Sequence, residues 1–265
     1  MARRWYIKNI LHSTPEERRR ICALVVPDSL LLRFGINRET FQDQQGRGRM
    51  EIVARDEGSL LNVRITNPDF VIDPIFSTFL RDADEDTLEV VGININNPQS
   101  QRFAIDLDEF GKITISMKRR NVEEEERAMR ASLAPGQVRK GLGALKDFLR
   151  SLERFAGHVG ADFLTGEALA YHNAILYEIL GFRYHFSSIH EEMVWIDSEF
   201  RNPNGILSQR LDGSTPFRQP GFGKSARGRS WAVQDGILGY QWGRPMMVKE
   251  VGKRAGVRTF SVRPG

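Results

Sequence analysis

The sequence has almost no cysteine and no long apolar run, and each absence excludes a class of protein. Cys22 is the one cysteine among 265 residues, which rules out an intrachain disulfide and a cysteine-based zinc site. Because disulfides belong to oxidising compartments, this cysteine usage favours the reducing cytoplasm. No stretch approaches the roughly 20 consecutive apolar residues of a membrane helix, and no apolar signal-peptide core follows the charged start. We therefore expect a cytoplasmic protein without a membrane partner.

Acidic residues are scarce in the last quarter of the chain. Residues 201–265 contain 12 Lys+Arg and 3 Asp+Glu, a net charge of +9, whereas the first 200 residues contain 26 and 31, a net charge of −5. A basic tail on an acidic body predicts either a polyanionic partner for the tail or a tail that packs against the body.

The first half of the sequence has the pattern of an N-terminal helix followed by an antiparallel meander. Thr14 and Pro15 are good opening residues for a helix that ends near Val25. Strand-like segments follow at residues 50–55, 59–66, 87–95, 101–107 and 112–118. The last two have alternating hydrophobic residues, which is typical of half-buried strands in a hairpin.

The second half has mainly helical periodicity. A charged helix is expected over residues 122–133, and a long amphipathic helix over residues 142–156. A short strand at Phe163 and Leu164 precedes a helix over residues 168–180, which Gly181 ends. A strand is expected over residues 182–187, and residues 193–196 are compatible with either a strand or a helix.

Glycine and basic residues surround the start of the long helix. The segment reads Pro135-Gly136-Gln137-Val138-Arg139-Lys140-Gly141-Leu142-Gly143-Ala144. Glycines let the backbone approach phosphates closely, and a helix N-terminus offers free N–H groups and partial positive charge. This turn resembles the pyrophosphate-binding turn of the GNAT acyltransferase superfamily. The resemblance implies that the cofactor is bound by Val138, Arg139, Lys140, Gly141, Leu142, Gly143 and Ala144.

A second segment resembles the late helix and following strand of the same superfamily. It runs from Asn173 through Tyr177 to Gly181-Phe182-Arg183-Tyr184. The resemblance implies that Tyr177 protonates the departing CoA thiolate, for which a phenol of pKa near 10 is a suitable acid. The family's usual Asn position is occupied here by Ala170, and Asn173 or His172 is the substitute expected to contact the cofactor. The sequence does not single out a general base: Glu167, just after the expected central strand, is one candidate, and Glu191 and Glu192 are the others.

Together these segments imply an α/β (α+β) fold of the GNAT type, with a mixed, mainly antiparallel sheet flanked by helices. Residues 1–200 would form the acyl-CoA-binding domain, with its cofactor half at residues 135–190, and residues 201–265 a basic extension. The expected activity is transfer of an acetyl or longer acyl group from acyl-CoA to the amine of a small molecule or peptide. Positioning of the two reactants would provide most of the catalysis, and no metal is required.

Other readings stay open at this point. Val138 stands where the family prefers Arg or Gln, and residues 122–133 are helical where the family has a strand, which favours a non-catalytic CoA- or ligand-binding protein. A cluster of basic and aromatic side chains in the tail favours a nucleic-acid or assembly factor, or a tail that binds the body. It consists of Phe217, Arg218, Phe222, Lys224, Arg227, Arg229 and Trp231. Trp242, Met246 and Met247 are candidates for a homodimer interface.

Overall fold

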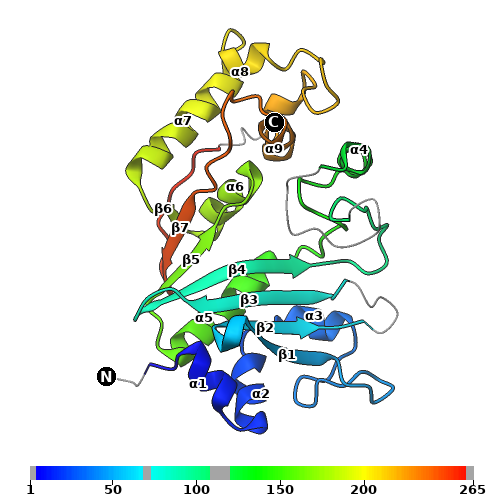
Figure 1. Cartoon of the computed structure of the whole chain (residues 1–265), viewed down its shortest axis with the longest axis vertical. Helices are drawn as coiled ribbons and strands as arrows, with labels where there is room; N and C mark the ends of the chain where they lie inside the picture. Colours follow the sequence, from blue (N-terminus) through cyan, green and yellow to red (C-terminus); the bar gives the residue numbers. More distant parts are fainter. Residues whose placement is uncertain (1–3, 68–72, 108–119, 261–265) are drawn as a thin grey trace. The chain divides into compact units, whose positions relative to one another are not determined.

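The computed structural model describes residues 4–67, 73–107 and 120–260 (Figure 1). The chain divides into two units, each assembled from three segments. Unit 1 consists of Met1–Gln99, Gly141–Glu167 and Val248–Arg254, and unit 2 of Ser100–Lys140, Ala168–Met247 and Ala255–Gly265. Because residues 168–247 lie within one unit, this division does not follow the boundary predicted at residue 200.

Unit 1 is a sheet with helices. Its elements are α1 (Ile7–His12), α2 (Pro15–Ala23), α3 (Asp28–Arg33), β1 (Met50–Arg55), η1 (Asp56–Gly58), β2 (Leu60–Ile65), β3 (Phe76–Asp82), β4 (Thr87–Ile95), α5 (Leu145–Val159) and β5 (Phe163–Glu167). Neighbouring strands from β1 to β4 are antiparallel, and β5 is parallel to β4. The final part of β7 (Met246–Glu250) follows β5 in the strand order.

The helices of unit 1 begin and end where local chemistry dictates. Thr14 caps α2 by accepting a hydrogen bond from the N–H of Glu17 at 3.2 Å, and Pro15 occupies the first turn, as predicted. Gly160, at a φ of 75°, ends α5 in the left-handed conformation that glycine adopts without strain.

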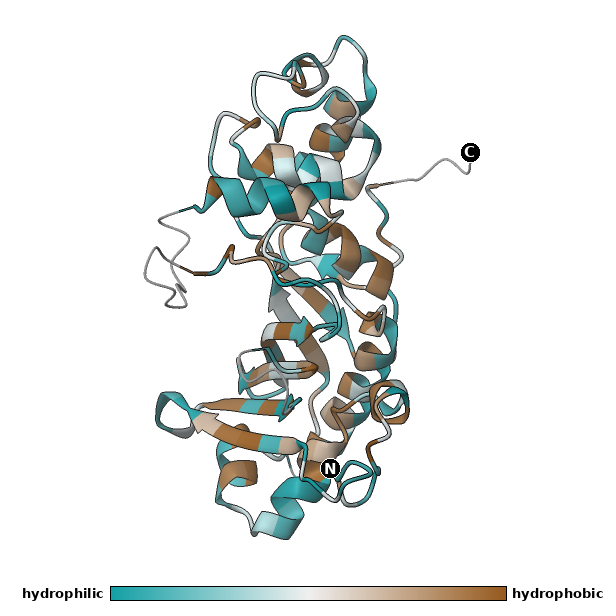
Figure 2. Ribbon diagram, turned by 90° about the vertical axis from the view of Figure 1, so that its right-hand side faces the viewer, coloured by the Kyte–Doolittle hydropathy of each residue, from teal (hydrophilic) through white to brown (hydrophobic). Residues whose placement is uncertain are grey.

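One face of the sheet carries the core of unit 1. Phe76 of β3 packs against Phe148 of α5 with ring centroids 5.7 Å apart. On the same side of β3, Asp82 accepts a hydrogen bond from the N–H of Ile7 at the start of α1 at 2.7 Å. The alternation of hydrophobic and hydrophilic residues along the strands is visible in Figure 2.

Unit 2 is mainly helical. Its elements are α4 (Val122–Arg130), α6 (Tyr171–Leu180), β6 (Arg183–Tyr184), α7 (Ser187–Arg201), α8 (Ile206–Gln209), η2 (Phe222–Lys224) and α9 (Ala226–Gln234). The first residues of β7 lie beside β6, because the N–H of His185 donates to the carbonyl of Met246 at 3.0 Å. The core includes Trp231, which stacks on Phe217 and donates its indole N–H to the carbonyl of Leu133 at 2.9 Å.

The fold class is therefore mixed α and β with mainly antiparallel strand pairs, as the sequence predicted at that level. One strand prediction differs from the structure, and another falls on residues that the structure does not describe. Residues 101–107 form no named strand, and residues 112–118 lie outside the described residues. Residues 193–196, which were compatible with either strand or helix, belong to α7. No helix in the described part of the chain is long and apolar enough to cross a membrane.

Candidate functional site

The predicted cofactor turn of unit 1 lies at the N-terminus of α5. Ala144 is the N-cap residue and provides no side-chain hydrogen bond to the first helical N–H groups. Gly143 precedes it with a φ of 74°, a conformation that favours glycine. The 15-residue helix therefore presents an N-terminus that no side chain caps, next to a turn that contains Gly141 and Gly143. Asp147 in the first turn is ion-paired with Arg150 at 2.8 Å.

The turn is attached to the end of β4. Asn96, the residue after β4, forms an isolated antiparallel bridge with Gly141. A β-carbon on Gly141 would lie 3.5 Å from the carbonyl oxygen of Ile95, an ordinary contact distance. The guanidinium of Arg33, from the last turn of α3, reaches the carbonyl of Leu142 at 3.5 Å. Arg33 was not among the predicted site residues, because its proximity comes only from the tertiary fold.

The strand before the turn is β4 and not the segment immediately upstream of Pro135. Residues 122–130 are helical, as predicted, and the strand that leads to the turn lies further upstream in the sequence. Residues between Asn96 and Gly141 therefore lie, along the chain, between β4 and the turn.

The parallel strands β4 and β5 separate at a bulge. They pair from Thr87 and Phe163 to Val90 and Gly166, after which β4 continues to Ile95. Opposite β3, Phe79 pairs with Gly92 and Leu80 with Val90. Val91 is therefore the extra residue of a β-bulge, a feature that bends a strand and often lies beside a functional site.

Charged side chains gather on the sheet face opposite the core, near the end of β5. Glu89 pairs in register with Thr165, so Glu89 and Glu167 share this face by alternation. Arg81 donates to both carboxylate oxygens of Glu89, at 2.7 and 3.0 Å. The pKa of Arg81 is raised, first by these hydrogen bonds and to a smaller degree by the charge of Glu167. Glu167 is exposed and Glu89 is buried, so Glu89 is a second carboxylate that the sequence did not single out.

The remaining residues of the predicted turn lie in unit 2 and have structural contacts there. The carbonyl of Val138 accepts a hydrogen bond from the N–H of Phe103 at 2.8 Å. Arg139 is buried and donates to the carbonyl of Ser100, and the N–H of Lys140 donates to the hydroxyl of Ser100 at 3.2 Å. The guanidinium of Arg139 is thus held by its own chain.

The residues predicted on the late helix belong to α6 of unit 2. Tyr177 is half-buried, with its ring edge against Phe182 at a centroid distance of 4.8 Å. Asn173 accepts a hydrogen bond from the N–H of Ala170 at 3.0 Å, which satisfies a donor at the start of α6. Asn173 therefore has a capping role that accounts for its position without a cofactor.

A buried polar contact joins α6 to α9. His172 lies 2.9 Å from the hydroxyl of Ser230 through Nδ1, and its backbone N–H donates to the same oxygen at 3.3 Å. Burial, with a smaller effect from Arg227, lowers the pKa of His172 to about 4. His172 is therefore neutral at pH 7. Within the described ranges, no group of three or more His, Cys, Asp or Glu side chains could hold a metal ion.

Most of the basic and aromatic cluster in the tail stabilises unit 2. Arg229 is buried and pairs with Asp197 at 2.7 Å, and Arg218 pairs with Asp235 at 2.9 Å. Lys224 is exposed. These contacts support the reading in which the tail packs into the protein.

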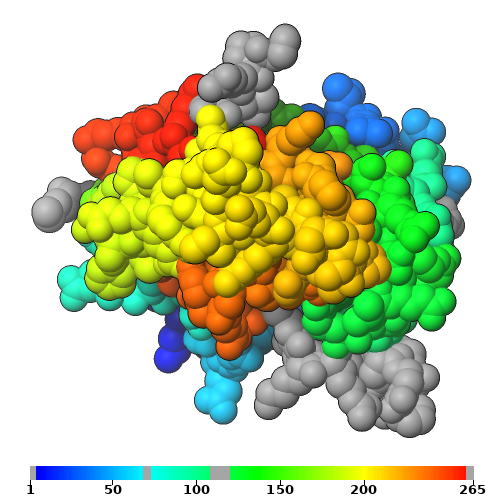
Figure 3. All heavy atoms as spheres, turned by 90° about the horizontal axis from the view of Figure 1, so that it is seen from above, coloured from blue at the N-terminus to red at the C-terminus, as the bar shows by residue number. Residues whose placement is uncertain are grey.

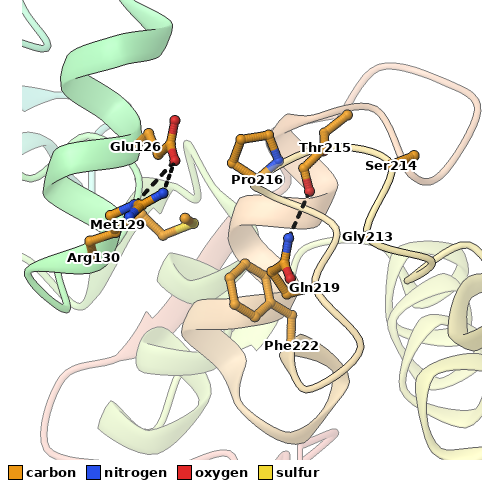
Figure 4. A pocket seen from close by; sticks show the side chains of 9 residues that line it. All are labelled: Glu126, Met129, Arg130, Gly213, Ser214, Thr215, Pro216, Gln219 and Phe222. Carbon is orange, nitrogen blue, oxygen red and sulfur yellow. Dashed lines mark hydrogen bonds and ion pairs between the residues drawn. The ribbon is translucent and has the colours of Figure 1, made fainter.

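A separate cavity of about 550 Å³ lies in unit 2 between α4 and the loop before η2. Figure 4 shows the half-buried Phe222 and Met129 facing this space from opposite sides, with the Glu126–Arg130 ion pair at the rim. No residue predicted for the cofactor site lines this cavity.

No family model, no curated protein and no solved structure matches the chain. The geometry of the residues themselves is therefore the basis for a functional inference.

Proposed function

We propose that the protein binds acyl-CoA and transfers the acyl group to an amine. The observation that carries this proposal is the β4–turn–α5–β5 crossover of unit 1. It brings a helix N-terminus bordered by Gly141 and Gly143 to the carboxyl end of two parallel strands. Ligands of open α/β sheets bind at such ends, and helix N-termini favour the anionic phosphates of a nucleotide cofactor.

The separation of β4 and β5 supports the same proposal. Beyond Val90 the strand β4 continues without a parallel partner in β5, and in this proposal an extended ligand pairs with the backbone of residues 91–95 on that side. The pantetheine arm of CoA is extended and carries amide groups, which makes it a chemically suitable occupant of this edge. Arg33 adds a positive charge next to the turn.

The proposed chemistry is direct attack of an amine nitrogen on the thioester carbonyl. A carboxylate, Glu167 in this proposal, accepts the proton of the amine. The carbon–sulfur bond breaks, and the CoA thiolate leaves with a proton from a general acid, the role that the resemblance assigned to Tyr177. Both roles are testable separately from binding, because neither residue is needed to hold the phosphates.

A non-catalytic acyl-CoA-binding protein is the second candidate. Asn173 caps α6 and Arg139 binds Ser100, so two polar side chains predicted to contact the cofactor are used inside unit 2. In that case the crossover of unit 1 would still bind the cofactor, but Tyr177 would not act as a general acid and Glu167 would not act as a general base.

Calorimetric titration with CoA, acetyl-CoA and octanoyl-CoA tests binding. Gly141→Glu places a negative charge at the turn, and Gly141→Ala is its matched control, because a β-carbon fits there at 3.5 Å from Ile95. We expect micromolar binding by the wild type, at least tenfold weaker binding by Gly141→Glu, since about 1.4 kcal/mol of repulsion suffices, and little change for Gly141→Ala. Absence of wild-type binding to all three ligands, or equal binding by Gly141→Glu, would contradict the proposal.

Release of CoA thiol in the presence of an amine panel then separates the two candidates. A catalytic protein releases CoA in an amine-dependent reaction that Tyr177→Phe slows by about 10²-fold or more, the usual loss when a general acid is removed. If the wild type and Tyr177→Phe both bind acyl-CoA tightly and neither releases CoA when an amine is added, the binding-only candidate is established instead.

A further inference from the structure

The cavity of about 550 Å³ in unit 2 has two walls that come from different parts of the chain. One wall is the second half of α4, with Glu126, Met129 and Arg130. The other runs from the loop before η2 to the first residue of η2, with Pro216 and Phe222. In Figure 3 the yellow-orange loop and the green segment that contains α4 lie side by side on the face turned to the viewer. The volume is within the range of about 300–1,000 Å³ that is usual for small-molecule sites.

The loop wall is held on the C-terminal end of α9. Asp235, the C-cap residue of α9, accepts hydrogen bonds from the hydroxyl of Thr215 at 2.8 Å and from Arg218 at 2.9 Å. Phe217, which lies between these two loop residues in sequence, is buried and stacks on Trp231 of α9. These contacts fix the loop at the edge of the cavity.

The α4 wall is held on the same end of α9. Gln234, the last residue of α9, donates from its side chain to the carboxylate of Glu125 at 2.9 Å. Arg120, just before α4, pairs with the same carboxylate at 2.6 Å and donates to the carbonyl of Gln234 at 3.4 Å. Because two adjacent residues at the end of α9 hold the two walls, the cavity is formed before any ligand binds. A preformed site loses little conformational entropy on binding.

The lining combines an apolar surface with one ion pair at the rim (Figure 4). Met129 and Phe222 are half-buried and face the space from opposite sides, and Pro216 lines it with them. Glu126 and Arg130 are the charged side chains of the lining, so its net charge is zero. Arg130 donates through Nε and Nη2 to a single carboxylate oxygen, Oε1, of Glu126. Among the residues that the structure describes, Nη1 of Arg130 and Oε2 of Glu126 have no hydrogen-bond partner, so both remain available to a ligand.

We propose that this cavity binds a free aromatic α-amino acid. The head of such a molecule carries a carboxylate and an ammonium on one carbon, and the rim of the cavity offers a cation and an anion side by side. The ligand carboxylate binds the guanidinium of Arg130, and the ligand ammonium binds the carboxylate of Glu126. The aromatic ring packs between Phe222 and Met129, because rings make favourable edge and offset contacts with other rings and with thioether sulfur.

The neutral lining disfavours nucleotides and other strongly anionic ligands, since an anion that approaches Arg130 also approaches Glu126. None of the described lining residues belongs to the β4–turn–α5–β5 crossover, so the inference is independent of the proposed acyltransferase function. The cavity is also separate from the residues predicted for a homodimer interface. Of these, Trp242 donates its indole N–H to the carbonyl of Ala168 at 2.9 Å, and Met247 is fully buried.

Calorimetric titration of the full-length protein with phenylalanine, and with two analogues that each lack one charge, tests the class of ligand. Phenethylamine has no carboxylate, and 3-phenylpropionate has no ammonium. We expect phenylalanine to bind with a dissociation constant of about 100 μM or lower, and each analogue to bind at least tenfold more weakly, since a loss of about 1.4 kcal/mol suffices. Absence of binding by phenylalanine, tyrosine and tryptophan would overturn the proposal, and so would equal affinity for phenylalanine and either analogue.

The variants Arg130→Gln and Glu126→Gln test the position of the site. Each removes one charge from the rim, and each is expected to weaken phenylalanine binding about tenfold or more. The side chain of Arg130 is 75% exposed, so its replacement leaves the fold intact. Arg127→Gln is the matched control, because Arg127 also pairs with a glutamate of α4, Glu124, but does not line the cavity. Wild-type affinity in both rim variants would overturn the proposal, as would an equal loss of affinity in the control.

Discussion

At the scale of single residues, the main change from the sequence reading is the role of polar side chains. Asn173 and Arg139 were predicted to contact a cofactor, and each has a local structural partner. The sequence could not show this, because the partners Ala170 and Ser100 are recognised only from backbone geometry. Arg33 and Glu89 are the opposite case, because the sequence did not predict them as site residues. Tertiary folding brings Arg33 near the turn and Glu89 near Glu167.

His172 links stability to pH. Burial lowers its pKa to about 4, below the value near 6.5 of an exposed histidine. Between these values the unfolded chain binds a proton that the folded protein does not, so folding stability is present above pH 6.5 and is lost as the pH falls towards 4. Urea unfolding at pH 7 and pH 5 is expected to show a loss of about 2 kcal/mol from this group.

The variant His172→Gln provides the comparison. It is expected to be less stable at pH 7, because the contact with Ser230 changes, yet its stability should fall less between pH 7 and pH 5 than that of the wild type. An identical pH dependence in both proteins would show that another group is responsible.

At the scale of secondary-structure elements, the sequence correctly predicted the helices and strands in which the spacing of hydrophobic residues matches the pattern of buried positions. The hairpin of β1 and β2, the amphipathic α5 and the glycine end of α6 were correct. The strand β3 was missed because Phe76, Ser77 and Thr78 are all buried, so no alternation marks it. Residues 101–107 were wrongly predicted as a strand. Their alternating residues include Phe103, which packs against Ala128 and Leu133, so a loop on α4 satisfies the same pattern.

Two glycines in helices have opposite expected responses to alanine. Gly157 lies on the exposed side of α5, and an added β-carbon would meet nothing within 4 Å. A β-carbon on Gly228 in α9 would lie 2.6 Å from the carbonyl oxygen of Phe222. We expect Gly157→Ala to stabilise the protein by about 0.5–1 kcal/mol. Gly228→Ala should destabilise it by about 2 kcal/mol or more, because η2 must move.

Chemical denaturation of both variants measures the difference, and each serves as the control for the other. A stable Gly228→Ala protein would mean that η2 and α9 are not packed as closely as the structure shows.

At the scale of the whole molecule, the chain passes repeatedly between the two units. Unit 1 includes residues 248–254, where Lys249 pairs with Glu153 at 2.9 Å and the N–H of Val251 donates to the backbone carbonyl of Asp162 at 2.9 Å. Unit 2 needs Thr259, which donates two hydrogen bonds to the buried Glu178. The sequence shows that charge and composition change near residue 201. It does not show the long-range contacts that tie the later residues to both units.

Truncation tests the boundary that the composition predicted. A fragment of residues 1–200 lacks segments of both units, and we expect it to show no cooperative thermal transition by circular dichroism, unlike the full-length chain. A cooperatively folding fragment would instead support residues 1–200 as a domain with a separable extension.

The bridge between Asn96 and Gly141 has a consequence for how this chain can be shortened. A segment whose two ends are held side by side can be acquired or lost without changing the register of the strand before it or the helix after it. In unit 1, the bridge makes the long excursion between β4 and α5 equivalent to a tight turn. Such a junction is a suitable point for replacing the excursion with a short turn in the laboratory.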